Sequence, residues 1–191
     1  PHYMIGSLMG ATTHIVAKSR EPVVSDMNLA IVPTATFEEC PKDLDIICVP
    51  GGTSGTLAAM RDDATMAFLK DRGSRAKYVS SVCTGSLILG AAGLLKGYKA
   101  TSHWATRDLL DIFGAEPVNA RVVTDRNRIT GAGVADYARG VQLIAEYHPE
   151  PPFDAGTPER AGPKATEMMT AMFEPFVAEA RKAAEAAMKR L

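Results

Sequence analysis

Two short apolar segments of this sequence each run into a glycine-containing turn, and this pattern is the strongest constraint on the fold. Asp45–Val49 is rich in β-branched residues and is followed by Pro50-Gly51-Gly52-Thr53. Tyr78–Val82 is a second such segment, followed by Cys83-Thr84-Gly85-Ser86 and a predicted apolar helix, Leu87–Ala92. Strands that alternate with helices indicate a mostly parallel sheet, so we expect an α/β fold.

The remaining segments fit a single domain over residues 1–191, a length typical of one domain. Asp45–Val49 is continuously apolar, which favours a strand covered on both faces. Further helices are predicted over His2–Met9, Ala64–Gly73 (closed by its glycine), His103–Phe113 and Asp136–Tyr147. Further strands are predicted over Thr13–Ala17, Lys99–Ser102, Arg121–Thr124 and Arg128–Thr130, with two antiparallel strands within Val23–Thr36.

A C-terminal arm and helix occupy residues 149–191. Pro149–Pro163 is rich in proline and glycine, which predicts an extended arm. A long helix follows, with Pro163 at its first position and a kink at Pro175. Its apolar stripe spans about 28 residues, or ~42 Å, which exceeds what one small domain needs. We therefore expect part of this helix to contact a second subunit in a homodimer; the alternative is that it wraps its own sheet.

Composition narrows the functional classes. Lys and Arg minus Asp and Glu gives 21 − 22 = −1, which argues against a nucleic-acid or membrane-surface protein. No apolar run reaches the ~18 residues of a membrane helix. The three cysteines form no CxxC pair, and their odd number argues against a disulfide framework and for a reducing, cytoplasmic environment. No His, Cys, Asp or Glu cluster has metal-ligand spacing, so we expect no metal.

Cys83 lies at the predicted corner between a strand and a helix. This geometry is that of a nucleophile elbow, which exposes the reactive atom at the carboxyl edge of the sheet. The positive end of a helix dipole there favours the thiolate, the nucleophilic form. The alternative is a small buried core residue, the usual place of a free cysteine. Cys40 and Cys48 begin no helix, so we expect them to be structural.

The turn after the first strand is expected to face the same edge. Gly51 and Gly52 allow backbone N–H groups to turn toward a ligand, next to the nucleophile. Thr84 has a hydroxyl and a backbone N–H close to where a reacting atom would lie. His103 follows the strand predicted over Lys99–Ser102; it either approaches this edge or packs with Trp104, and we favour the structural role.

Four motifs resemble the PfpI-type branch of the class-I glutamine-amidotransferase-like superfamily. They are Val49-Pro50-Gly51-Gly52-Thr53, Ser80-Ser81-Val82-Cys83-Thr84-Gly85-Ser86, Gly90-Ala91-Ala92-Gly93-Leu94-Leu95 and Ala100-Thr101-Ser102-His103-Trp104. Within that branch, the arm Pro151–Pro158 is similar to that of bacterial isonitrile hydratases, which also fits Thr rather than His after the cysteine.

The resemblance implies a flavodoxin-like three-layer α/β/α sandwich and a homodimeric, cofactor-free enzyme. Its reaction would convert an isonitrile and water to an N-substituted formamide. Cys83 would be the nucleophile and form a thioimidate, which water hydrolyses. Thr84 would supply a pocket hydroxyl and a backbone donor. The substrate or oxyanion would be bound by Gly51, Gly52, Thr53, Gly85 and His103.

Two departures from the family pattern lead to further expectations. The family's acidic residue near the cysteine belongs to a stretch that would precede Pro1, and the family's helical stretch after Val134 is shortened here. We therefore expect additional residues before Pro1 and after Val134. Three other functions stay open: the ligand-sensing domain of a transcription regulator, another cysteine hydrolase or deglycase of the superfamily, and a purely structural stress protein.

Overall fold

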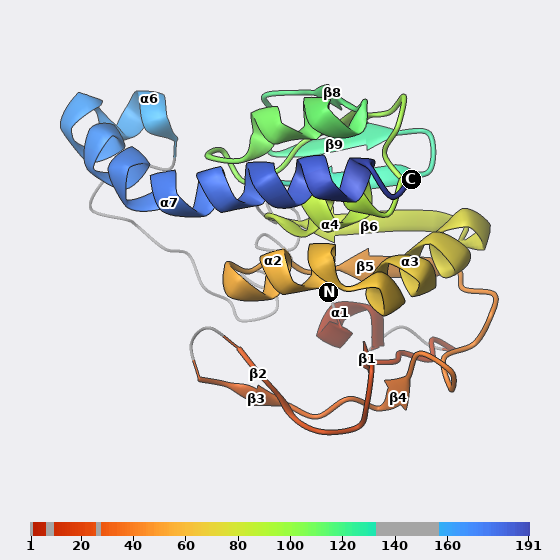
Figure 1. Cartoon of the computed structure of the whole chain (residues 1–191). Helices are drawn as coiled ribbons and strands as arrows, with labels where there is room; N and C mark the ends of the chain where they lie inside the picture. The colour runs from red at the N-terminus through yellow and green to blue at the C-terminus, as the bar shows by residue number, and fades with distance from the viewer. Residues whose placement is uncertain (1, 7–9, 26–27, 133–156) are drawn as a thin grey trace.

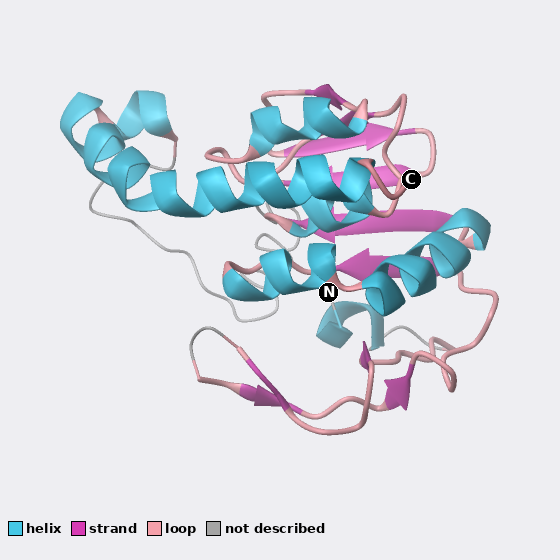
Figure 2. Cartoon of the chain, viewed as in Figure 1, coloured by secondary structure: helices cyan, strands magenta, loops and turns pink. Residues whose placement is uncertain are grey.

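The computed structural model describes residues 2–6, 10–25, 28–132 and 157–191. Its main sheet has the strand order β5 (Ile46–Val49), β6 (Tyr78–Val82), β10 (Arg128–Gly131) and β9 (Val122–Asp125). The first three strands are parallel, and β9 pairs antiparallel with β10 at the edge. Helices pack against the strands of this sheet, as Figure 2 shows, so the predicted mixed α/β architecture is confirmed.

Five helical segments pack on one another over this sheet (Figure 1). They are α2 (Ser54–Arg61), α3 (Asp63–Arg75), α4 (Gly85–Ala91), the 3-10 helix η1 (Arg107–Phe113) and α7 (Pro163–Met188). All residues of α4 are buried, because this helix contacts each of the other four as well as β5 and β6. The core is formed by Leu87 and Leu89 of α4, together with Met60, Val79, Leu110 and Phe113.

Short elements surround this body. β1 (Val16–Ala17) pairs parallel with β4 (Ala35–Thr36), and β2 (Val23–Val24) pairs antiparallel with β3 (Ala30–Ile31). β7 (Lys99–Ala100) pairs with β8 (Glu116–Pro117). The remaining described helices are α1 (His2–Gly6) and α6 (Pro158–Ala161).

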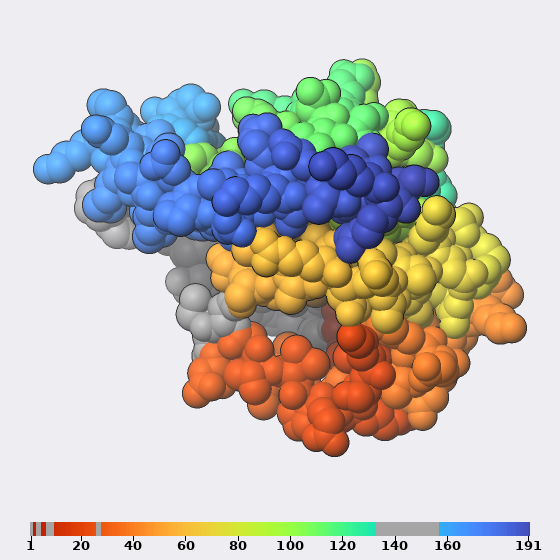
Figure 3. Space-filling view, in the orientation of Figure 1, coloured from red at the N-terminus to blue at the C-terminus, as the bar shows by residue number. Residues whose placement is uncertain are grey.

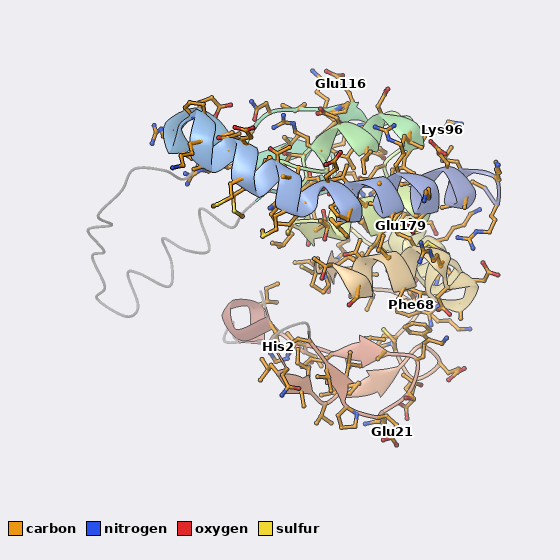
Figure 4. The ribbon with its side chains drawn as sticks, turned by 60° about the vertical axis from the view of Figure 1, so that its left-hand side comes forward. His2, Glu21, Phe68, Lys96, Glu116 and Glu179 are labelled. Atoms are coloured by element: carbon orange, nitrogen blue, oxygen red, sulfur yellow. The ribbon has the colours of Figure 1, made fainter. Side chains whose placement is uncertain are left out.

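The N-terminal segment, which is the part of the chain before β5, is held to α3 by aromatic stacking and by the side chain of Arg72. The Phe37 and Phe68 rings stack with centroids 4.4 Å apart, and Figure 4 shows Phe68 on α3 pointing toward this segment. The Arg72 guanidinium lies 5.3 Å from the Phe68 ring centroid and donates to the carbonyl oxygens of Phe37, Cys40 and Pro41. These contacts attach residues 37–41 to the sheet-covering layer.

Several expected elements differ in extent or type. Tyr78–Val82 is a strand with the predicted bounds. β5 buries Ile47 and Val49 but leaves Ile46 exposed, so it is less covered than a strand enclosed on both faces. Helix α3 continues past Gly73, which is buried inside it against Leu94. The predicted helix over residues 103–113 is a 3-10 helix that begins at Arg107 and ends at the left-handed Gly114.

The C-terminal predictions are partly tested. Residues 149–156 of the predicted arm, the helix predicted over Asp136–Tyr147 and the Val134–Ala135 junction lie outside the described residues. The described end of the arm forms α6, and α7 begins at Pro163 as predicted. The helix continues through Pro175 and changes direction along its length (Figure 1).

No helix among the described residues is both long and apolar enough to cross a membrane.

Candidate active site

Cys83 occupies a tight corner directly after β6. Its φ of 58° lies in the left-handed region, which non-glycine residues adopt at a cost of about 1–3 kcal/mol. The corner is held by a 2.7 Å hydrogen bond from the Cys83 N–H to the Gly131 carbonyl at the end of β10. The residue is half-buried. The predicted elbow is therefore present, and Cys83 is not enclosed in the core.

Two serine hydroxyls hold the carbonyl side of the same residue. Ser86, in the first turn of α4, donates to the Cys83 carbonyl oxygen at 3.2 Å. Ser102, which follows β7, donates to that oxygen at 3.1 Å and shares a 3.1 Å hydrogen bond with Thr106. Ser86, Ser102 and Thr106 are all buried. Since both polar groups of the Cys83 backbone have partners, the strained corner has a fixed orientation.

Two glycines let the turn after β5 approach this corner. A Cβ atom on Gly51 would lie 2.7 Å from the Thr84 backbone nitrogen and 3.0 Å from the Cys83 Cβ. A Cβ atom on Gly85 would lie 2.2 Å from the Val49 carbonyl oxygen. These distances leave no room for a side chain at either position. Gly85 is buried against the backbone of β5, where it supports the corner.

The Thr84 side chain joins the two turns. Its hydroxyl donates to the Gly52 carbonyl at 2.8 Å and accepts from the Gly52 N–H at 3.0 Å. It also lies 2.9 Å from the Thr56 hydroxyl of α2, which in turn lies 3.0 Å from the Gly52 carbonyl and can donate to either group. Although Thr84 is the N-cap residue of α4, its side chain does not cap that helix. It cross-links the elbow to the neighbouring turn.

This arrangement differs from the sequence expectation for Thr84 and Gly52. We expected the Thr84 hydroxyl to line a pocket and the Gly52 amide to face a ligand. The structure binds the two groups to each other, and Thr84 is only 3% exposed. Gly51 and Thr53 are exposed on either side, and Thr53 is the N-cap residue of α2. Thr84 and Gly52 therefore fix the shape of the site next to Cys83.

His103 belongs to the same side of the molecule through its neighbour Ser102. Its ring centroid lies 5.5 Å from that of Trp104 and 5.0 Å from that of Phe173 on α7. The Ala105 N–H donates to its Nδ1 at 3.3 Å. Burial lowers the pKa of His103, which favours the neutral ring. The ring is therefore packed between Trp104 and Phe173.

The other two cysteines lie away from the elbow. Cys40 is buried beside Arg72, and burial raises the pKa of its thiol although the Arg72 guanidinium acts in the opposite direction. Cys48 is half-buried within β5. Across the described parts of the chain, no three His, Cys, Asp or Glu side chains are grouped so as to hold a metal ion.

Sequence reasoning missed Thr56 and the helix that carries it. Ser54–Arg61 begins with Ser-Gly-Thr, a composition typical of a turn, and it follows the Gly51-Gly52 turn directly. A signal was present in Leu57 and Met60, which are three residues apart and lie on the core side of α2.

The sequence profile of the DJ-1/PfpI family matches residues 5–146, which is most of the chain. The chain belongs to the DJ-1/PfpI family. The match includes both turns of the site and confirms the resemblance inferred from their motifs. The flavodoxin-like sandwich that the resemblance implied is also confirmed, because the chain superposes closely on a solved structure of a ThiJ/PfpI family protein.

Two relatives and one crystal structure are similar to this chain over most of its length. An isonitrile hydratase of Pseudomonas putida is 47% identical over 177 residues, which cover 84% of this chain and 77% of the relative. A deglycase of Thermococcus kodakarensis is 30% identical over 128 residues, 66% of this chain and 76% of the relative. The crystal structure of a ThiJ/PfpI family protein from Pseudomonas syringae superposes with a TM-score of 0.89 at 56% identity, covering 96% of this chain and 82% of that one.

Proposed function

We propose that this protein is an isonitrile hydratase in which Cys83 is the nucleophile. The observation that carries the proposal is the 47% identity to the Pseudomonas putida isonitrile hydratase over 84% of the chain. The half-buried Cys83 at a positive φ supports the assignment of the nucleophile, because this corner holds the residue at the carboxyl edge of the parallel strands.

The reaction balances as an addition of water. In the first step the Cys83 sulfur bonds to the terminal isonitrile carbon while that carbon takes up a proton, giving the thioimidate R–N=CH–S–Cys83. Water then adds across the C=N bond, so that oxygen bonds to carbon and a proton goes to nitrogen. The C–S bond breaks, the product R–NH–CHO leaves, and the remaining proton returns the thiol.

The residues around Cys83 hold the reacting groups in place through neutral hydrogen bonds. Ser86 and Ser102 hold the Cys83 carbonyl, and Thr84 holds the Gly51–Gly52 turn next to the sulfur-bearing corner. A fixed orientation of the reacting groups lowers the entropy cost of the first step. An isonitrile is uncharged, so it requires no cationic side chain for binding.

The first prediction concerns the thiol itself. Purified protein incubated with a simple alkyl or aryl isonitrile is expected to produce the corresponding formamide. The loss of the isonitrile infrared band measures the reaction. Cys83→Ala is expected to abolish turnover because it removes the atom that bonds to carbon. Cys48→Ala, which removes a half-buried thiol of β5, is the matched control and should keep full activity. Unchanged turnover in Cys83→Ala would disprove the mechanism.

A further inference from the structure

Thr56 has a buried hydroxyl with two kinds of partner. The residue is 1% exposed. Its bond to the Gly52 carbonyl, 3.0 Å long, spans four residues and is the local contact that a helical threonine commonly makes. Its 2.9 Å contact with the Thr84 hydroxyl spans 28 residues and leaves the helix for the elbow. The second contact is the one that a merely helical role does not require.

The hydrogen-bonding capacity of Thr84 explains why this third group matters. The Thr84 hydroxyl has one proton, given to the Gly52 carbonyl, and two lone pairs, one of which accepts from the Gly52 N–H. The Thr56 hydroxyl has one proton, and both the second lone pair of Thr84 and the Gly52 carbonyl are within its reach, so it donates to one of them at a time. When the Thr56 proton goes to Thr84, the Thr84 hydroxyl is held by three hydrogen bonds.

The turn held in this way leaves no space for a side chain between itself and the nucleophile. A Cβ on Gly51 would meet the Cys83 Cβ at 3.0 Å and the Thr84 nitrogen and hydroxyl oxygen at 2.7 Å. A rotation of the Thr84 side chain would break its two hydrogen bonds to Gly52, which fix the turn next to Cys83. Displacements of about 1 Å at a reacting centre can cost on the order of 100-fold in rate.

We propose that Thr56 is a positioning residue for the reaction, acting through Thr84 to set the separation between the Gly51–Gly52 turn and Cys83. The inference rests on the proposed function and adds a residue of α2 to the site. It concerns the geometry of the reacting groups, so it predicts an effect on turnover and not on substrate affinity.

The test compares two substitutions of this residue. Thr56→Val keeps the branched shape and removes the hydroxyl; its kcat for an isonitrile should fall about tenfold, with KM within about twofold of the wild type. A tenfold loss corresponds to about 1.4 kcal/mol, within the range of one buried hydrogen bond. Thr56→Ser keeps the hydroxyl and should restore most of the turnover.

Thr101→Val is the matched control for the loss of a buried hydroxyl. Thr101 is fully buried, and its hydroxyl donates to the Ala120 carbonyl at 2.9 Å. Urea denaturation should show similar losses of stability in Thr101→Val and Thr56→Val, while only Thr56→Val loses turnover. Wild-type turnover in Thr56→Val, or an equal loss in Thr101→Val, would overturn the positioning role.

Failure of the proposed function gives a different pattern, because the wild type itself is then inactive with isonitriles. In that case amide hydrogen exchange at Gly52, followed by NMR, still tests the positioning of the turn. Faster exchange in Thr56→Val, with wild-type exchange in Thr56→Ser, would support it. Equal exchange rates in all three proteins would refute it.

Discussion

Gly85 lies where the cysteine corner after β6 packs against the turn after β5, with no space for a side chain between them. Gly85 places its α-carbon so close to β5 that a methyl group would lie 2.2 Å from the Val49 carbonyl oxygen and 2.9 Å from the Pro50 carbonyl oxygen. Both contacts are with backbone, which cannot move aside by a side-chain rotation. The glycine therefore allows the cysteine corner and the glycine turn to form one site.

Gly85→Ala is expected to lower the free energy of unfolding by about 1–3 kcal/mol, because the added methyl group overpacks a buried contact. Gly55→Ala is the matched control: Gly55 lies in α2 with nothing within 4 Å of an added Cβ. Since alanine has the higher helix propensity, this control should unfold at an equal or slightly higher urea concentration. Equal stability of the two variants would contradict the close approach.

The residues of the site differ in how visible they are in the sequence. Cys83 could be predicted because a strand segment, a cysteine and a glycine follow one another directly. The partners of Thr84 could not, since Gly52 and Thr56 are 32 and 28 residues away and hydroxyl contacts leave no periodic pattern. Gly85 was expected to face a ligand, but its close packing depends on the separation of β5 and β6.

The start of helix α3 is joined to the segment after β1 by the side chain of Asp62. Asp62 is its N-cap residue and accepts from the Thr65 N–H at 2.8 Å. It also forms a 2.7 Å ion pair with Lys18, which follows β1. Hydrogen bonds from Lys18 and Thr65 lower the pKa of Asp62 from 3.8 to about 2. The carboxylate therefore joins the start of α3 to the N-terminal segment.

Asp62→Ala should lower the free energy of unfolding by about 1 kcal/mol at pH 7, the usual effect of losing an N-cap. Because the folded-state pKa is depressed, the stabilisation is fully present above pH 3.8 and is lost as pH falls through about 2. Urea denaturation at a series of pH values measures this difference. Asp62→Asn keeps the capping oxygen without the charge, so its stability should lack this dependence. A wild-type minus Asp62→Ala difference constant from pH 7 to 2 would rule out the assignment.

Element boundaries were predictable where one signal dominated. The β-rich segment Tyr78–Val82 and the proline at the start of α7 gave correct positions. Gly73 misled because its packing against Leu94 requires a glycine within the helix and not at its end. The segment after Ser102 forms a 3-10 helix only from Arg107; before it, the Ser102 hydroxyl donates to the Cys83 carbonyl and lies 3.1 Å from the Thr106 hydroxyl.

Helix α7 extends beyond the helices and strands that it covers. Its 26 residues correspond to about 39 Å. Ala180, Ala183, Ala184 and Ala187 are buried against the body, and Glu179 pairs with Arg61 of α2 at 2.9 Å, between the two helices in Figure 4. The earlier part of the helix projects past the rest of the described surface (Figure 3). Met168 and Met172 there are 65% and 60% exposed.

We propose that this projecting part of α7 contacts a second copy of the chain. Sedimentation equilibrium at micromolar concentration should give twice the mass of the single chain as measured under denaturing conditions. The double substitution Met168→Glu and Met172→Glu should shift the protein toward the monomer, because it places charge in an apolar contact.

Val23→Glu with Val24→Glu is the matched control for this substitution. It changes two exposed apolar residues of β2 and should leave the dimer intact. A wild-type monomer, or dissociation by the β2 substitution alone, would exclude the α7 contact.

The left-handed backbone at Cys83 also has a consequence for the order of events during folding. An unstructured chain leaves this conformation almost empty, and the partners that enforce it, Gly131 and Ser102, come from segments made later in synthesis. The thiol thus acquires its native surroundings only once distant parts of the chain have assembled. Brief pulses of an alkylating reagent during refolding would then date the completion of the tertiary structure.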